Sequence, residues 1–308
     1  MHPAFSVIVF TVSAGAGYGL MMFLVLAHLS GFAGALDINR ILLLGGLALV
    51  LITIGLISST FHLANPKNAW RAFSRFRTSW LSREGVFAVL TYPSILAYLF
   101  CVWYHDGALT GLVIATGVAA AVFSLITVFT TGMIYACLKT IRQWNTALTP
   151  ANYILLGLML GTLIFTAIQG ETVLMGVALG VIGIAALMKA IYFFWIGKPT
   201  GPSINTATGF TRGKVRLLDV GHTAGTFLTD EFGYRVQSAR LVQLRYLVFL
   251  LGFIVPAALL GFILWGQGSV LLAYVAMLVS FSGVVVERWL FFAEARHVVN
   301  LYYGMQRT

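Results

Sequence analysis

His62 and Glu84 are the two residues of this sequence whose chemistry and position are most informative. An imidazole titrates near pH ~6.5, so it can donate a hydrogen bond or move a proton at neutral pH. A partly buried carboxylate can also exchange protons, because burial disfavours its charged form. Plainer roles stay open for both: His62 at a membrane interface, and Glu84, which follows Ser82, as an acid in the first turn of a capped helix.

The elements that position this pair are membrane spans. The chain is 59% hydrophobic and 9% charged, with a mean hydropathy of +0.93, and so few charges cannot cover the surface of a water-soluble protein of this length. The sequence predicts an all-α integral membrane protein, a bundle of eight transmembrane helices. The predicted spans are 5–30, 41–61, 85–104, 109–138, 152–170, 172–196, 246–265 and 269–293. His62 ends the second span and Glu84 opens the third, so both lie at the same end of the bundle.

The positive charges predict the orientation of the bundle. Of the nineteen lysine and arginine residues, all but Arg40 fall on the face that carries both termini and the linkers 62–84, 139–151 and 197–245. Cytoplasmic loops of membrane proteins carry an excess of Lys and Arg. We therefore expect one membrane domain over 1–308, with both termini and these linkers in the cytoplasm.

The basic face is the predicted surface for a partner. Residues 64–82 mix arginines with tryptophan and phenylalanine and predict an amphipathic interfacial helix. Linker 197–245 shows turn and short-strand signals followed by a helix over 231–248. Attraction to anionic lipids accounts for part of the charge. The partner-docking candidates are Arg71, Arg75, Arg77, Arg212, Arg216 and Arg235.

A quinone dissolved in the bilayer is the ligand that best suits the first pair. It needs a hydrogen-bond donor for a carbonyl, a group that moves a proton, and apolar walls. The candidate quinone-binding residues are His62, Glu84 and the adjoining Arg83. Arg83 could pair with Glu84, or bind lipid or a partner.

Ionisable residues inside spans are costly, so each is a candidate for function. Glu287 and Glu294 are seven residues apart on one face of the last span and are candidates for a proton path. An ion-pair network that holds the last helix is the alternative, and the more ordinary one. Lys189, about two turns from its helix end, is expected to extend its amine to the interface.

No metal site, catalytic nucleophile or nucleic acid partner is indicated by the sequence. No haem is expected either, because haem ligands usually lie well inside a span. His28 and His105 lie at the outer face, and His2, His62 and His297 at the inner one. The two cysteines are too few to hold an iron–sulfur cluster, which needs about four.

Three separated motifs resemble the membrane-anchor subunit of the DMSO reductase family of molybdenum enzymes. They are MHPAFSVIVFTVSAGAGYGL at the start, STFHLANPKNAWRAFSRFRTSWLSRE, and HTAGTFLTDEFGYRVQSARLVQLR. The resemblance implies a heterotrimer in which this chain tethers an iron–sulfur subunit and a molybdopterin catalytic subunit. It also implies that the anchor exchanges electrons with the quinone pool of the bacterial inner membrane, and that His62 and Glu84 stand at positions implicated in quinone binding.

Two branches of this family differ in the direction of electron flow. The motifs SREG and EFGYRV are more similar to the sequences of one branch. That branch oxidises sulfite to sulfate and reduces quinone, with its catalytic subunits in the cytoplasm. A predicted cytoplasmic basic face favours the same branch. The alternatives are an anchor that oxidises quinol, as in DMSO reductase itself, and, from another class, a membrane transporter.

Overall fold

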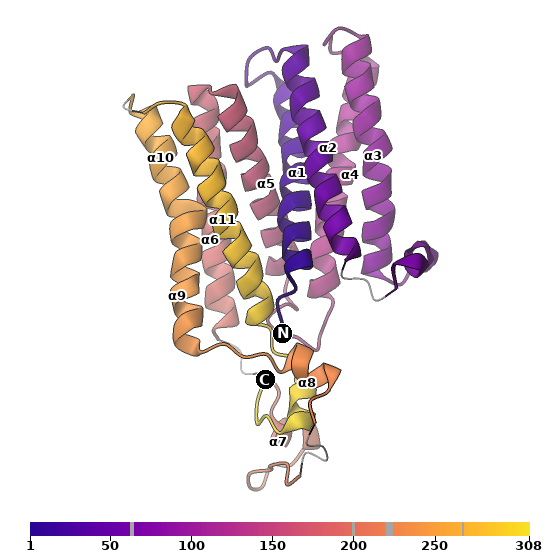
Figure 1. Cartoon of the computed structure of the whole chain (residues 1–308), viewed down its shortest axis with the longest axis vertical. Helices are drawn as coiled ribbons and strands as arrows, with labels where there is room; N and C mark the ends of the chain where they lie inside the picture. Colours follow the sequence, from indigo (N-terminus) through magenta and orange to yellow (C-terminus); the bar gives the residue numbers. More distant parts are fainter. Residues whose placement is uncertain (62–64, 199–200, 220–223, 267) are drawn as a thin grey trace.

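The chain folds into a bundle of long apolar helices (Figure 1). The computed structural model describes residues 1–61, 65–198, 201–219, 224–266 and 268–308. Within these residues, eight helical rods are long and apolar enough to cross a membrane, which confirms the predicted fold class. They are α1 Phe5–Ser30, α2 Ile38–Thr60, α3 Trp80–Tyr104, α4 Gly111–Ala136, α5 Leu148–Gln169, α6 Thr172–Ile196, the continuous rod Ser238–Leu264, and α11 Leu271–Ala293.

Helices α1 and α5 form the centre of the bundle. Helix α1 packs against α2, α4, α5 and α11, and its backbone touches that of α5. A Cβ added at Gly19 would lie 1.9 Å from the carbonyl oxygen of Gly157, and one added at Gly161 would lie 2.1 Å from the backbone nitrogen of Leu20. Small residues are what allow transmembrane helices to approach this closely.

The seventh rod changes its helical winding near its middle. It consists of α9 Ser238–Phe249, a π-helical turn Leu250–Ile254, and α10 Val255–Leu264. Pro256 has no backbone N–H, so the carbonyl of Gly252 loses its usual donor. The hydroxyl of Ser280 on α11 donates to this carbonyl at 3.0 Å. The neighbouring helix thus satisfies the backbone group that proline leaves free, as a bilayer requires.

The prediction for the long linker was wrong in part. Instead of one helix over 231–248, the structure has α8 Phe227–Phe232 and, after a non-helical break, α9 from Ser238. Gly233 ends α8 by donating its N–H to Thr229. The described part of the linker contains the short helix α7 Ile204–Thr208 and no strand beyond an isolated bridge between Ser203 and Arg307. The helix predicted over 64–82 is present only in part: residues 66–75 form a 3₁₀ helix, η1 Pro66–Arg75, and the residues from Trp80 on belong to α3.

Both termini lie at the same end of the bundle, at the bottom of Figure 1. We call the structure there the terminal cap, formed by residues 1–4, 201–219, 224–237 and 294–308. The backbone N–H of His2 donates to Glu231 at 2.8 Å, and the α-amine of Met1 donates to Ala295 at 3.1 Å. The N–H of Thr308 donates to Pro202 at 3.2 Å. The last 3₁₀ helix, η3 Val298–Tyr303, completes this cap.

Candidate functional site

Glu84 is a buried residue inside the bundle. Helix α3 begins at Trp80, capped by the side chain of Ser79, a little over one turn earlier than the predicted span, so Glu84 lies in a helical turn rather than at the end of a linker. The residue is 6% exposed, and the hydroxyl of Thr131 on α4 donates to its Oε1 at 2.5 Å. The Glu84 carboxyl is therefore buried, with Thr131 as its hydrogen-bond partner.

Aromatic rings pack on one another around the first turns of α3, where Glu84 lies. Trp80 packs edge-on against Phe129, with ring centroids 6.1 Å apart. Phe87 lies between Phe76, at 5.9 Å, and Phe123, at 6.3 Å. These rings come from α3, α4 and the segment after η1, and they supply apolar walls of the kind that a quinone ring requires.

The other two quinone-site candidates differ from Glu84 in what the structure says of them. Arg83 does not point to Glu84: its Nε donates to the carbonyl of Phe76 at 3.0 Å and its Nη2 to that of Arg77 at 2.9 Å. Its guanidinium also stacks over the ring of Trp80 at 4.1 Å. Arg83 thus holds the turn between η1 and α3. His62 lies outside the described residues.

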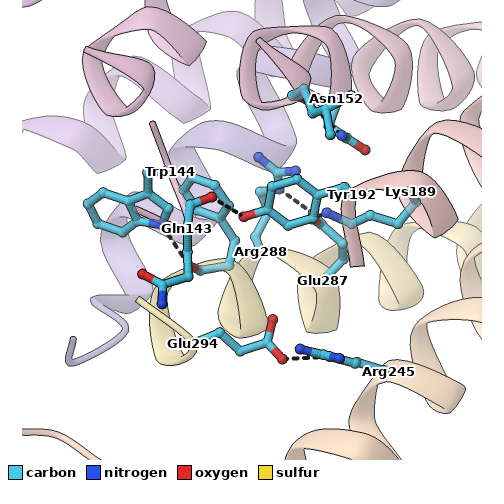
Figure 2. Close-up of polar contacts among 11 residues, drawn as sticks. Gln143, Trp144, Asn152, Lys189, Tyr192, Arg245, Glu287, Arg288 and Glu294 are labelled. Carbon is cyan, nitrogen blue, oxygen red and sulfur yellow. Dashed lines mark hydrogen bonds and ion pairs between the residues drawn. The ribbon is translucent and has the colours of Figure 1, made fainter. Parts of the chain in front are cut away.

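A second set of buried charges lies between α6 and α11 (Figure 2). We call Lys189 on α6 and Glu287 and Arg288 on α11 the charge triad. The two carboxylate oxygens of Glu287 pair with the Lys189 amine and the Arg288 Nε, respectively. The three side chains are 1%, 1% and 3% exposed. Lys189 therefore does not reach the interface as predicted, because Glu287 offers it a buried partner.

Glu294 and Arg245 form the outer part of the same charged region. The Nε of Arg245 donates to Oε1 of Glu294 at 2.7 Å, as Figure 2 shows. Burial raises the pKa of the Glu294 carboxyl above its ordinary value, and the neighbouring Arg245 opposes this rise. Glu287 and Glu294 thus both belong to ion pairs, which was the more ordinary of the two interpretations of their spacing.

A cavity of about 460 Å³ opens beside Glu294 in the terminal cap. Arg235, Arg245 and Arg296 line it together with Glu294. The second carboxylate oxygen of Glu294 is buried and makes no hydrogen bond with the described residues. The cavity therefore brings the arginines of the terminal cap next to the buried carboxylate of Glu294.

The docking candidates are all exposed and fall into two groups. Arg71, Arg75 and Arg77 lie on or just after η1, whereas Arg212, Arg216 and Arg235 lie in the cap. The single cation predicted on the other face, Arg40, lies at the start of α2 and donates to the carbonyl of Ile168 at 2.7 Å.

The histidines that could have been haem ligands have other contacts where the structure describes them. Nδ1 of His28 is 2.7 Å from the hydroxyl of Tyr98, and His297 packs on Phe232 with ring centroids 4.6 Å apart. No group of three potential metal ligands occurs among the described residues. The cysteines, Cys101 and Cys137, are free and belong to different helix ends.

Thr131, Tyr18 and Tyr153 are polar residues near these sites that sequence reasoning missed. Each lies in an apolar run and is of a type common in membrane helices, so neither composition nor spacing distinguishes it. Lys189 and Glu287 did carry a signal, since two opposite charges in apolar spans are expected to pair.

The fold and the buried charges define a multi-pass membrane protein whose polar groups gather near one end. A profile of the DMSO reductase anchor subunit (DmsC) family matches residues 1–305, and the chain belongs to this family. It is 35% identical to the corresponding subunit of the sulfite dehydrogenase of Allochromatium vinosum, over 98% of this chain and 99% of the relative. The resemblance seen in the sequence is thus confirmed. The chain is an anchor subunit of an oxidoreductase complex, which implies catalytic and other partner subunits.

Proposed function

We propose that this anchor carries electrons from a docked iron–sulfur subunit to quinone in the bilayer, and that Glu84 is the central residue of the quinone site. The observation that supports this most is the burial of Glu84 in the second turn of α3, with Thr131 as its hydrogen-bond partner and with aromatic rings packed on the same part of α3. A quinone has two carbonyl oxygens to hydrogen-bond and a flat apolar ring, and this chemistry fits such a setting.

The remaining parts of the site have different roles in the proposal. His62 supplies a hydrogen bond to a carbonyl, while Arg83 orders the turn that leads into α3. Glu287 and Glu294 serve in proton uptake from the basic face. No haem takes part, and molybdopterin and iron–sulfur clusters belong to the partner subunits.

The overall reaction we favour is oxidation of sulfite to sulfate, coupled to reduction of quinone. Sulfite is the substrate in the name of the relative that this chain matches over nearly its whole length. In this proposal the chain lies in a bacterial inner membrane with the terminal cap in the cytoplasm, where the catalytic subunits dock. An anchor that oxidises quinol is the second candidate, because the family is named after the anchor subunit of DMSO reductase, an enzyme that oxidises quinol.

Glu84→Gln tests the quinone site in the assembled complex. We expect quinone-dependent turnover to fall about 100-fold or more, which is the usual scale for loss of a proton-transfer group. Turnover with an artificial acceptor that takes electrons from the catalytic subunits should be unchanged. Glu171→Gln, an exposed carboxylate at the other end of the bundle, is the matched control. An equal loss with both acceptors would show that Glu84 is structural.

The docking surface is tested by reversing charge on the cap. Arg212→Glu together with Arg216→Glu should release the partner subunits from purified membranes, whereas Arg40→Glu at the opposite end should retain them. If both variants keep their partners, the cap is not the docking surface. Isolation of the wild-type chain without any redox subunit would favour the transporter alternative.

The orientation has a test that uses a native side chain. Cys137 is free, exposed and located at the cap end of α4. A membrane-impermeant maleimide should label it in inside-out vesicles and not in intact spheroplasts, with Cys137→Ser as the background control. Labelling from the outside would place the cap in the periplasm and favour the DMSO reductase arrangement.

A further inference from the structure

Two small cavities lie in the bundle core between Glu84 and the charge triad. Each has a volume of about 10 Å³. The first is lined by Tyr18 and by Thr131, the residue that binds Glu84. The second is lined by Arg288 of the triad. Thr11 and Tyr153 line both cavities, so the two adjoin each other.

Buried polar atoms that lack partners border these cavities. The hydroxyl of Tyr18 is buried and forms no hydrogen bond with the described residues. The hydroxyl of Tyr153 and both terminal nitrogens of Arg288 are also buried; they approach each other directly but without a hydrogen bond of full geometry. Leaving such groups unpaired is unfavourable, so they are normally satisfied by protein or by ordered water. A cavity of this size accommodates about one water molecule, provided that it offers two or more polar partners. Both cavities meet this condition.

We propose that a water molecule in each cavity joins the Glu84–Thr131 pair to the charge triad, which makes a proton path through the core from the terminal cap to the quinone site. This inference rests on the proposed function of Glu84. Its order is the cap cavity, Glu294, the triad, the water beside Arg288, Tyr153, the water beside Tyr18, and then Thr131 and Glu84.

The chemistry of the reaction requires such a supply. Reduction of one quinone to quinol takes up two electrons and two protons. The electrons come from the iron–sulfur clusters of the partner, and the protons come from water at the basic face. Hydroxyls and waters can each donate and accept a hydrogen bond, and so they can pass a proton along. Arg288 keeps its proton and instead orients the water beside it.

Electrostatic contacts extend along the same line. The Arg288 guanidinium lies 4.1 Å from the centre of the Tyr153 ring, and Tyr153 is close enough to both Arg288 and Glu84 to feel their charges. Lys189 interacts with Glu294 as well as with Glu287. Glu84 itself is only 6% exposed, so little of its carboxyl is open to the surface.

Gly15→Ala is a variant designed to fill the cavity beside Tyr18. Gly15 lines it, and a Cβ at this position would meet only the Cα of Gly157, at an ordinary 3.9 Å. The added methyl group therefore displaces water without pushing helices apart. Gly180→Ala is the matched control, because a Cβ there meets nothing within 4 Å. We expect Gly15→Ala to lower quinone-dependent turnover at least about tenfold and to raise its solvent deuterium isotope effect, with artificial-acceptor turnover unchanged.

Tyr153→Phe is the second variant, and it removes a hydroxyl without adding volume. This hydroxyl approaches Arg288 and Tyr135 without a hydrogen bond of full geometry, so its loss should cost less stability than the loss of a complete hydrogen bond. Thr162→Val is the control, because Thr162 also has a buried unpartnered hydroxyl and lines neither cavity. Quinone-dependent turnover should fall in Tyr153→Phe and stay constant in Thr162→Val.

A readout that does not depend on activity is radiolytic labelling of the purified complex, which oxidises side chains next to ordered water. We expect labelling of Tyr153 and Tyr18 in the wild type. In Gly15→Ala the label should be lost from Tyr18, whereas Tyr153 should keep label because it also lines the second cavity, which Gly15 does not reach. Labelling of Tyr18 that persists in Gly15→Ala would overturn the water site beside it. Lost labelling with unchanged turnover would show that protons reach Glu84 directly from the surface instead.

Failure of this inference differs from failure of the quinone proposal. If Glu84→Gln stops quinone turnover while Gly15→Ala and Tyr153→Phe do not affect it, the quinone site stands and the path is wrong. If Glu84→Gln retains quinone turnover, the proposed function fails, and the path to Glu84 fails with it.

Discussion

Glu287→Gln tests how the charge triad stabilises the contact between α6 and α11. The substitution keeps the size of the side chain and removes its charge, which leaves Lys189 and Arg288 as two buried cations without a counter-charge. Removing one partner of a buried ion pair costs about 3–5 kcal/mol. Lys189→Met should cost less, below about 2 kcal/mol, because the pair of Glu287 and Arg288 stays neutral.

The double variant Lys189→Met, Glu287→Gln tests whether uncompensated positive charge causes the loss of stability. It leaves one buried cation, Arg288, instead of two, so it should be more stable than Glu287→Gln alone. The measurement is the thermal unfolding midpoint of the purified protein in detergent. A cost of about 3–5 kcal/mol corresponds to a decrease of roughly 6–20 °C for Glu287→Gln. Glu171→Gln, an exposed carboxylate, should leave the midpoint unchanged.

The order of the three variants decides the outcome. We expect Glu287→Gln to unfold first, then the double variant, then Lys189→Met. If Glu287→Gln is no less stable than Lys189→Met, the carboxylate is not what compensates both cations. If the double variant is less stable than Glu287→Gln, Lys189 contributes by packing rather than by its charge.

Three further outcomes follow from the packing and from the titratable groups of the cap. Gly19→Ala should largely abolish folded protein in the membrane, because its methyl group would overlap the α5 backbone, whereas Gly180→Ala should accumulate normally. Burial raises the pKa of Glu294, with Arg245 opposing, so stability from this group falls as pH rises above the ordinary value of 4.5; Glu294→Gln should flatten that fall in unfolding midpoints. Burial lowers the pKa of His297, so the stability that its neutral form contributes is present above pH 6.5 and is lost as the pH falls below that value, through the lowered pKa; His297→Gln should remove that loss.

The membrane architecture was predictable because a bilayer imposes long apolar runs. Every predicted span corresponds to an observed rod, and the α5–α6 turn occurs where Gly170 adopts a positive φ of 74°. The ends were less predictable: α3 starts at Trp80 rather than at residue 85, since Ser79 caps it within a segment rich in charge. The long linker was interpreted wrongly because its folding depends on contacts with the two termini, which no local pattern reveals.

The candidate site also contains residues that the sequence could predict and residues that it could not. Glu84 could be selected from the sequence because a carboxylate at the start of an apolar run is unusual. Its partner Thr131 could not, because threonine in a membrane helix is common and only the packing of α3 on α4 brings the two together. The contacts of Arg83 with the carbonyls of Phe76 and Arg77 depend on how the turn before α3 folds. The position of Arg83 next to Glu84 in the sequence does not predict them.

The terminal cap has a consequence for how the protein is made. Its hydrogen bonds join the start of the chain to much later residues: His2 to Glu231 at 2.8 Å and Met1 to Ala295 at 3.1 Å. Because Ala295 follows α11 in the sequence, the Met1 contact can form only after α11 has been synthesised. An unfinished anchor therefore lacks the assembled cap, and subunits that dock on the cap would select completed chains during assembly.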